Sequence, residues 1–454
     1  MLRKGDLTQG GITGTLLHFT LPMMVGSFLQ QCYNIADTLI VGQCIGAGAL
    51  AAVGSAYTLM VFLISVLLGL AMGSGTVFSL HYGAGNHVAL RRSIFSSFAL
   101  IGIVTLILNV AVFIWLDPIL RLLQVPQDIY GMMRSYLWII FCGIVFTFIY
   151  NFYASLLRAV GDSVTPIWFL AVSVVLNIAL DLFFILQLDW GIQGAAAATV
   201  LAQGVAALGI IIYTYRRRPE LRWHHEDMCF DRTCLKEIAS FSTLTCVQQS
   251  VMNLGILMIQ GLVNSFGTAV MAAFAAAVKI DSFAYMPVQD FGNAFSTFIA
   301  QNYGAGEKER IRKGIRSAAA CSMVFCLAVS AAVCLLARPL MGLFVSPAET
   351  QIIAAGMRYL RIEASFYCGI GLLFLLYGFY RAIQKPGVSV VLTVISLGTR
   401  VALAYALSAI PSIGVTGIWV SVPIGWLLAD LAGILFYPFL SRRARKNASP
   451  ALYR

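Results

Sequence analysis

The sequence predicts an all-α integral membrane protein whose twelve transmembrane helices form two parallel six-helix repeats. Three observations support this. Of the 454 residues, 59% are hydrophobic and 11% are charged, whereas a soluble domain carries roughly 25% charged residues. The mean hydropathy is +0.85. The chain also repeats itself, and the repeat gives the arrangement of the helices.

Twelve apolar stretches are long enough to cross a bilayer, which takes about 17 to 25 helical residues. In the first half they cover 14–41, 50–80, 93–116, 131–153, 166–187 and 192–215. In the second half they cover 237–262, 269–300, 314–337, 350–378, 388–410 and 414–438. Membrane-spanning strands do not fit, because such strands need only about 10 alternating residues.

The second half repeats the first at a nearly fixed offset. The segment Tyr82 to Gly85, YGAG, returns as Tyr303 to Gly306, 221 residues later. After a two-residue indel the offset becomes 223, as for Arg158 and Arg381. Each repeat holds an even number of helices, so both enter the membrane from the same side, an arrangement that usually places a substrate cavity between two bundles.

This repeat sets the predicted domains: an N-terminal six-helix lobe (1–215), a cytoplasmic linker (216–236), a C-terminal six-helix lobe (237–438) and a basic cytoplasmic tail (439–454).

Most of the 30 Lys and Arg residues fall in loops on one side of the predicted helices, while the opposite loops hold few, chiefly Arg121 and Arg338. The positive-inside bias therefore predicts that both termini are cytoplasmic in a multi-pass protein of the plasma membrane. The net charge of +11 is better explained by topology and anionic lipid than by nucleic acid. The N-terminus shows no pattern of a cleaved signal peptide.

Cysteine and histidine give little support to a metal centre or an enzyme. The ten Cys residues lie mostly inside the apolar stretches, and the loop pair Cys229 and Cys234 does not have CxxC spacing. The five His residues lie at helix ends or in loops, where they supply no metal set or nucleophile-base pair. We expect no cofactor, and we do not expect an enzyme.

Acidic and amide side chains interrupt the apolar stretches of the first half. Gln30, Tyr33, Asn34 and Asp37 share one helical face, because they lie seven, four and three positions before Asp37 or at Asp37 itself. Two further polar stripes contain Asn177 with Asp181, and Thr199 with Gln203, each spaced i to i+4. An acid inside a membrane helix costs about 2.5 to 3.5 kcal/mol on insertion scales, so these stripes are predicted to face protein or water. Their oxygen atoms suit a hard monovalent cation or a shared proton.

The repeat provides an internal comparison. The counterparts of Asp37, Asn177, Asp181 and Thr199 in the second half are Met258, Arg400, Ala404 and Val422. An architectural role would favour keeping some of the polar groups, so we interpret the first half as functionally specialised. The alternative is that Asp37 and Asp181 only satisfy other buried polar groups.

Other charges inside the apolar stretches have either a structural or a functional interpretation. Five lie in the second half and are able to neutralise one another: Lys279, Asp281, Asp290, Glu363 and Arg400. Asp430 stands alone in the last stretch. Pro22 and Pro287 remove backbone donors and permit bending, either as hinges or as static kinks.

The chain resembles the multidrug and toxic compound extrusion (MATE) transporters over nearly its whole length. The resemblance rests on LPMMVGSFLQQCYNIADTLIVG in the first stretch, ALAAVG in the second, the paired YGAG segments, and RAVGDSVTP and QNYGAG. It implies a V-shaped pair of six-helix lobes that exports organic cations and amphipathic drugs against inflow of protons or sodium ions.

The resemblance also implies site residues. The family's first-lobe cation site, for H⁺ or Na⁺, matches Asp37, Asn177, Asp181 and Thr199. Its substrate-cavity positions match Gln30, Tyr33, Tyr136, Asn151 and Gln203, and Asn34 lies on the same stripe. One branch of the family has acids on helices 7 and 10. Here helix 7 reads Gln248, Gln249 and Ser250, and the inner part of helix 10 has no acid, which weakens the case for a second-lobe cation site.

The sequence therefore predicts a monomeric antiporter whose partners are small amphipathic or cationic substrates and membrane lipids. The choice between proton and sodium stays open. A flippase of a lipid-linked saccharide from the same superfamily is the alternative, although an anionic pyrophosphate substrate would favour a basic cavity, and the first half has no Lys or Arg deep in a helix.

Overall fold

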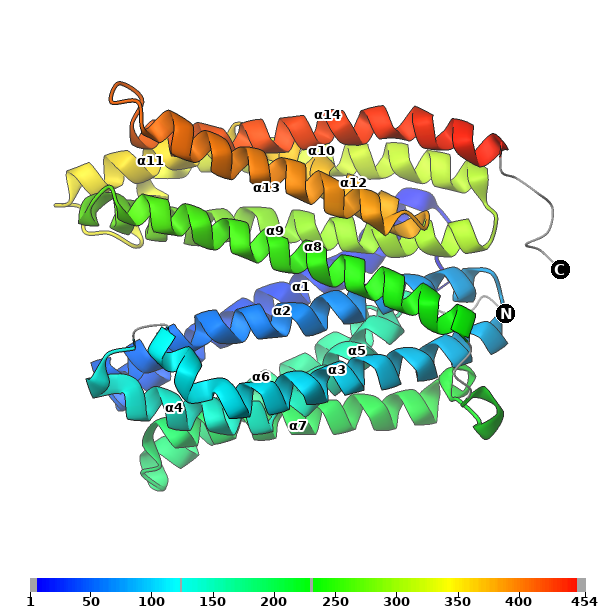
Figure 1. The fold of residues 1–454 in the computed structure, drawn as a ribbon, viewed down its shortest axis with the longest axis horizontal. Coiled ribbons are helices and arrows are strands. Elements are labelled where there is room, and N and C mark those ends of the chain that lie inside the picture. Colours follow the sequence, from blue (N-terminus) through cyan, green and yellow to red (C-terminus); the bar gives the residue numbers. More distant parts are fainter. Residues whose placement is uncertain (1–5, 123–124, 229–231, 447–454) are drawn as a thin grey trace. The chain divides into compact units, whose positions relative to one another are not determined.

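The computed structural model describes residues 6–122, 125–228 and 232–446, and each regular element in these ranges is a helix (Figure 1). In this part of the chain, ten helices are long and apolar enough to cross a membrane, and two bent helix pairs supply a further two spans. The predicted all-α membrane fold is confirmed.

The elements follow in chain order. They are α1 (Ile12–Cys44), α2 (Ala47–Gly83), α3 (His87–Leu122), α4 (Gln127–Cys142), α5 (Ile144–Ala159), α6 (Val164–Leu182), η1 (Phe183–Gln187), α7 (Gly191–Arg217), η2 (Pro219–Leu221), η3 (His225–Asp227), α8 (Arg232–Asn264), α9 (Thr268–Gly304), α10 (Lys308–Gly342), α11 (Thr350–Ala364), α12 (Tyr367–Ala382), α13 (Pro386–Ser408) and α14 (Val415–Lys446). Thus α14 continues into the predicted tail, and residues 447–454 lie outside the described part.

Two spans that the sequence predicted as single helices are bent. The axes of α4 and α5 differ by 47°, and those of α11 and α12 by 51°. The first bend lies at Gly143, where a Cβ atom would be 2.5 Å from the Val200 side chain of α7. The missing side chain therefore lets α7 pack into the bend. Phe366, 223 residues after Gly143, lies at the second bend.

The repeat also holds for backbone conformation. Four positions with positive φ in the first half have counterparts with positive φ at the offsets found in the sequence, and these pairs are Gly46 and Gly267, Gly85 and Gly306, Gly161 and Gln384, and Gly191 and Gly414. Such backbone is costly for residues with a Cβ atom. Its recurrence shows that both halves connect their helices in the same way.

The helices pack into two compact units. Unit 1 comprises the described residues up to 250 together with 297–312, and unit 2 comprises 251–296 together with the described residues from 313. Both α8 and α9 therefore contribute to each unit. This division describes packing and leaves the lobe boundaries predicted at 215 and 237 untested.

Aromatic side chains fill the centre of unit 1. Phe152 of α5 meets Phe78 of α2 edge to face, with ring centroids 5.9 Å apart, and lies 5.3 Å from Phe98 of α3. Lipid tails are as apolar as these rings, so the packing is stabilised by close contact more than by exclusion of water.

The two YGAG segments meet inside unit 1. A Cβ atom on Gly83, at the end of α2, would lie 2.0 Å from the carbonyl oxygen of Gln301 in α9, and one on Gly304 would lie 2.1 Å from that of Leu80. Gln301 also donates from Nε2 to the Ala159 carbonyl at 2.7 Å. The glycines of the repeated motif therefore allow two helix ends to touch through their backbones.

The segment between α7 and α8 folds onto unit 1. Asp227 of η3, nearly buried, accepts a hydrogen bond from Arg91 Nε at 2.7 Å and another from the backbone N–H of His224 at 3.0 Å. Burial acts to raise the pKa of the Asp227 carboxyl, but these two donors together hold it below its usual range. Within this predicted linker, Asp227 is therefore an ionised anchor.

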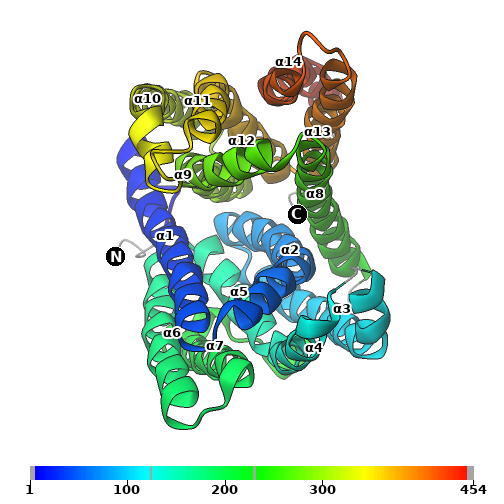
Figure 2. The same cartoon turned by 90° about the vertical axis from the view of Figure 1, so that its left-hand side faces the viewer.

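In unit 2, α13 and α14 lie side by side (Figure 1, Figure 2). Arg381 of α12 is buried beside α9, where it donates to Asn293 Oδ1 at 3.0 Å and to Ser296 Oγ at 3.3 Å. A buried guanidinium with several acceptors fixes the position of α12 against α9.

We expect Gly83→Ala to lower the free energy of unfolding by about 1–3 kcal/mol, because the new methyl group overlaps the Gln301 carbonyl. Thermal unfolding of the purified protein in detergent measures this. Gly54→Ala is the control, since it lies on the same helix with no atom within 4 Å of the added Cβ. Equal unfolding midpoints for both variants would contradict the proposed backbone contact.

Arg91→Gln removes the charge opposite Asp227. We expect a loss of about 1–3 kcal/mol of stability at pH 7. Because the folded-state pKa of Asp227 is lowered, its contribution is present above the ordinary pKa of about 4 and is lost as pH falls through the folded value. The difference from wild type should therefore shrink at acidic pH in the same unfolding assay. Exposed Arg217→Gln should show no such difference at any pH.

Candidate functional site

The polar stripe of α1 enters the interior of unit 1. Asp37 and Tyr33 are partly buried, and the Tyr33 hydroxyl lies 3.3 Å from Oγ1 of Thr199 on α7. Gln30 donates to Asn34 Oδ1 at 3.5 Å, and Asn34 donates to Gln31 at 3.2 Å. The first two turns of the stripe thus bond along the helix, while Tyr33 bonds across to α7.

The polar pair of α6 is completely buried. Asn177 and Asp181 each have 0% exposure, and Thr199 has 6%. Directly after Asp181 the helix changes to a π-helix over Phe183–Gln187. Such wide turns occur frequently at functional sites, because they shift the direction of nearby side chains.

The carboxyl groups of Asp37 and Asp181 lie within hydrogen-bonding reach of each other. In each residue Oδ1 is buried and accepts no hydrogen bond from the part of the chain that the structure describes. Two adjacent carboxylates repel each other, and buried acceptors require a donor or a cation. The arrangement therefore favours one positive charge, either a proton or a bound cation, between α1 and α6.

The Asn177 amide fits its neighbours in two ways. In one, Nδ2 donates to Asp181 Oδ2 at 3.1 Å, and Oδ1 accepts from the Thr199 backbone N–H at 3.2 Å. In the other, Nδ2 donates to Thr199 Oγ1 at 3.3 Å and Oδ1 faces the Asp181 carboxyl. The second orientation sets two oxygen atoms side by side, which a cation between them would stabilise.

The remaining predicted cavity residues divide into two groups. Tyr136 of α4 is buried and lies in the electrostatic field of Asp37, Tyr33 and Asp181. Gln203 instead accepts a hydrogen bond from Thr147 Oγ1 of α5, and Asn151 donates to the Thr147 carbonyl. The sequence analysis missed Thr147, although its i to i+4 spacing from Asn151 was a usable signal.

Two cavities in the described residues are lined by none of these predicted cavity residues. One, of about 800 Å³, lies in unit 1 beside the start of α1 and includes His18, Asp162 and Arg218. The other, of about 640 Å³, lies in unit 2 between α11 and α14. The predicted substrate positions thus remain a prediction.

Unit 2 holds a buried acid pair of its own. Asp281 of α9 accepts a hydrogen bond from Tyr367 Oη at 2.6 Å and lies within reach of Glu363 of α11. Both acids lie in the field of Arg400. Helix 10 therefore does carry a buried acid, Glu363, beyond the acid-free segment on which the sequence interpretation relied.

Asp430 of α14 is buried at 4% exposure, and its Oδ1 accepts no hydrogen bond from the described residues. Near it are Gly369 and Tyr377, both of α12. The structure gives it no charged neighbour that explains its burial.

The counterparts of the first-half site are apolar in unit 2. Ala404 and Val422 are buried at 0% and 1% exposure, and Met258 is 44% exposed. The acids of unit 2 therefore lie at positions unrelated by the repeat to those of unit 1.

Comparison with known proteins gives the family. The MatE family model matches residues 22–183 and again 245–406, so that the second match follows the first by the 223-residue offset of the repeat. The "Probable multidrug resistance protein YpnP" of Bacillus subtilis (strain 168) is 31% identical over 98% of this chain and 99% of its own length. A protein described as "FAD transporter" from Shewanella oneidensis is 24% identical over 95% of this chain and 96% of its own length.

A solved structure has the same fold. The outward-facing conformation of a multidrug resistance MATE family transporter of the MOP superfamily matches with a TM-score of 0.91 and 23% identity, covering 99% of this chain and 100% of that one. Together with the doubled family match, this places the twelve spans and the paired repeats in one known architecture. The chain belongs to the MatE family, the multidrug and toxic compound extrusion transporters.

Proposed function

We propose that the chain is a secondary active antiporter that exports amphipathic or cationic compounds in exchange for protons or sodium ions. The observation that carries this proposal is the pair of adjacent carboxyl groups, Asp37 and Asp181, each with a buried and unpartnered oxygen in the described structure. A membrane transporter with such a pair has a place where a small cation is strongly favoured.

The exchange follows from the charge of this pair. When neither a proton nor a sodium ion is bound, the negative charge of Asp37 and Asp181 favours a cationic cargo nearby. When a small cation enters, the negative charge falls and the attraction for cargo weakens. Release of cargo and entry of the cation are thereby linked. The membrane potential adds about 2.3 kcal/mol per charge per 100 mV, enough to drive export.

Asn177 and Thr199 would respond to the occupant. With a proton on the pair, the Asn177 amide is satisfied by donating to Asp181 and accepting from the Thr199 N–H. With a sodium ion, the reversed amide would offer Oδ1 beside Asp181 while Nδ2 donates to Thr199 Oγ1. A hard cation prefers such oxygen ligands, so the same four residues suit either ion.

The names of the relatives favour small-molecule export over the flippase alternative, although they differ in cargo, since one is a multidrug resistance protein and another a FAD transporter. In the first half, the acids Asp37 and Asp181 favour cationic cargo over anionic cargo. As a multi-span membrane protein, the chain would work in the plasma membrane, with both termini in the cytoplasm.

Asp37→Asn tests the carboxylate site. Proteoliposomes containing the full-length protein are given a proton or a sodium gradient, and movement of a fluorescent cationic dye is measured. We expect loss of dye export under both gradients, because an amide cannot take up either ion in exchange. Asp128→Asn, which changes an exposed acid at the start of α4, should transport normally. Retained coupling in a folded Asp37→Asn protein would refute the proposal.

Thr199→Val distinguishes the two coupling ions. A proton needs only a carboxylate, whereas sodium needs several oxygen ligands, so the lost hydroxyl should weaken sodium-driven export about tenfold or more and affect proton-driven export much less. The dye assay is run at a series of sodium concentrations. The mirrored control is Val422→Thr, at the equivalent position of the second half. An equal loss with both gradients would show that Thr199 serves packing only.

A further inference from the structure

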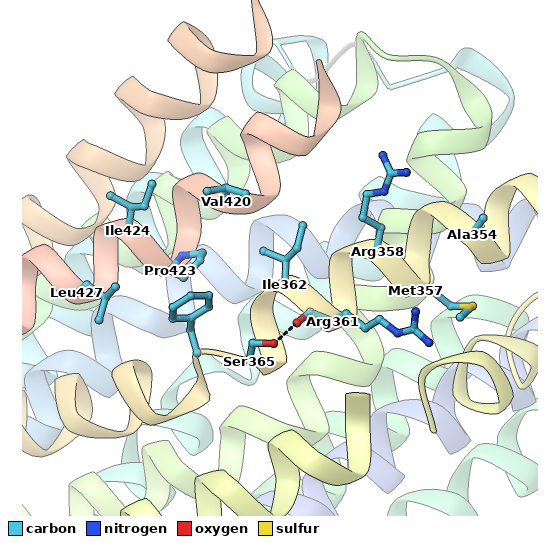
Figure 3. A pocket seen from close by; sticks show the side chains of 11 residues that line it. Ala354, Met357, Arg358, Arg361, Ile362, Ser365, Val420, Pro423, Ile424 and Leu427 are labelled. Carbon is cyan, nitrogen blue, oxygen red and sulfur yellow. Dashed lines mark hydrogen bonds between the residues drawn. The ribbon is translucent and has the colours of Figure 1, made fainter. Parts of the chain in front are cut away.

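The cavity of unit 2 combines an apolar wall with a positively charged end (Figure 3). Val420, Pro423, Ile424 and Leu427 of α14 form much of the wall, and Phe366 adds an aromatic ring. Arg358 and Arg361 of α11 line the same cavity and are exposed. A site of this composition is amphipathic along its length.

The two arginines have no acid to balance them. Within the described residues neither forms an ion pair, and Arg358 makes only a long contact, 3.4 Å from its Nη1 to Thr416 Oγ1. Ser365, also in the lining, donates to the Arg361 carbonyl at 2.6 Å and leaves the guanidinium groups unoccupied. Two guanidinium groups three residues apart on a helix present a concentrated positive charge.

The first repeat shows how the same place can be neutralised. Arg134 of α4, the counterpart of α11, donates to Asp117 Oδ1 at 2.8 Å, and Tyr130 donates to the same oxygen at 2.8 Å. At the 221-residue offset the counterpart of Asp117 is Arg338 of α10. The second repeat has therefore replaced the neutralising acid with a further cation.

This charge lies at the end of unit 2 where Lys and Arg are otherwise scarce. The lining of α14 spans residues 420–427, whereas its basic segment begins at Arg442, about 1.5 Å per residue further along the helix. The positive-inside bias therefore does not account for Arg358 and Arg361. A negatively charged ligand at that membrane surface does.

We propose that this cavity binds an anionic phospholipid, whose phosphate pairs with Arg358 and Arg361 and whose acyl chain lies along the α14 wall. Guanidinium groups pair with phosphate through two parallel hydrogen bonds, a geometry that ammonium lacks. The apolar residues at membrane depth match an acyl chain, and the bilayer supplies this ligand at high concentration. The inference does not depend on the transport mechanism.

Native mass spectrometry of the full-length protein tests it. The protein is released from mixed micelles that contain phosphatidylglycerol or phosphatidylcholine, and the affinity of the first bound lipid is measured. We expect wild type to prefer phosphatidylglycerol about tenfold, since the pairing of guanidinium with phosphate is charge-assisted. Arg358→Gln with Arg361→Gln should abolish this preference. Arg312→Gln with Arg316→Gln, an equal change of charge at exposed residues of α10, should keep it.

Further arms separate the lipid from other occupants. Ile424→Trp fills the apolar wall and keeps both arginines, so it should also weaken lipid binding; it serves as the test if the double arginine variant fails to fold. Arg358→Lys should give a partial loss. Competition by glycerol 3-phosphate alone would mean a site for soluble anions, and a dimer replacing the lipid adduct would mean a protein partner. Either result, or equal phosphatidylglycerol affinity of wild type and the folded double variant, overturns the proposal.

Discussion

The proximity of two buried carboxyl groups is the constraint on which the first unit depends. Asp37 of α1 and Asp181 of α6 lie within hydrogen-bonding reach, and in a low-dielectric interior a pair of negative charges repels strongly. One positive charge relieves this repulsion. Because Tyr33 and Thr199 link α1 to α7 around the same point, the occupant of the carboxyl pair also influences how three helices pack.

The duplicated halves have kept their geometry and changed their chemistry. Left-handed turns recur at equal offsets, and the bends at Gly143 and Phe366 lie 223 residues apart. Backbone conformation and packing therefore constrain both repeats alike. Ionisable groups are under no such shared constraint, so unit 2 has apolar residues where unit 1 has its carboxyl pair, and it buries Asp281 with Glu363 on other helices.

Much of the fold was predictable, because each span is a long apolar run and the repeat aligns the two halves. The bend at Gly143 was not, since hydropathy measures the length of a span and carries no information on its direction. In the site, helical spacing correctly grouped Asn177 with Asp181, but the contact between Asp37 and Asp181 joins helices far apart in sequence. The same reason hid the pairing of Asp281 with Glu363, and that of Thr147 with Gln203.

An antiporter site must accept two different occupants without being rebuilt, and the Asn177 amide meets this requirement physically. Its two ends have nearly the same size but opposite hydrogen-bonding character, so a half-turn of the amide changes the site from one that donates to Asp181 into one that offers an oxygen beside it. A leucine of similar volume would keep the packing and lose both states. The π-helix that begins two residues after Asp181 adds a second adjustable element, because its wider turn is less tightly bonded than the α-helix before it.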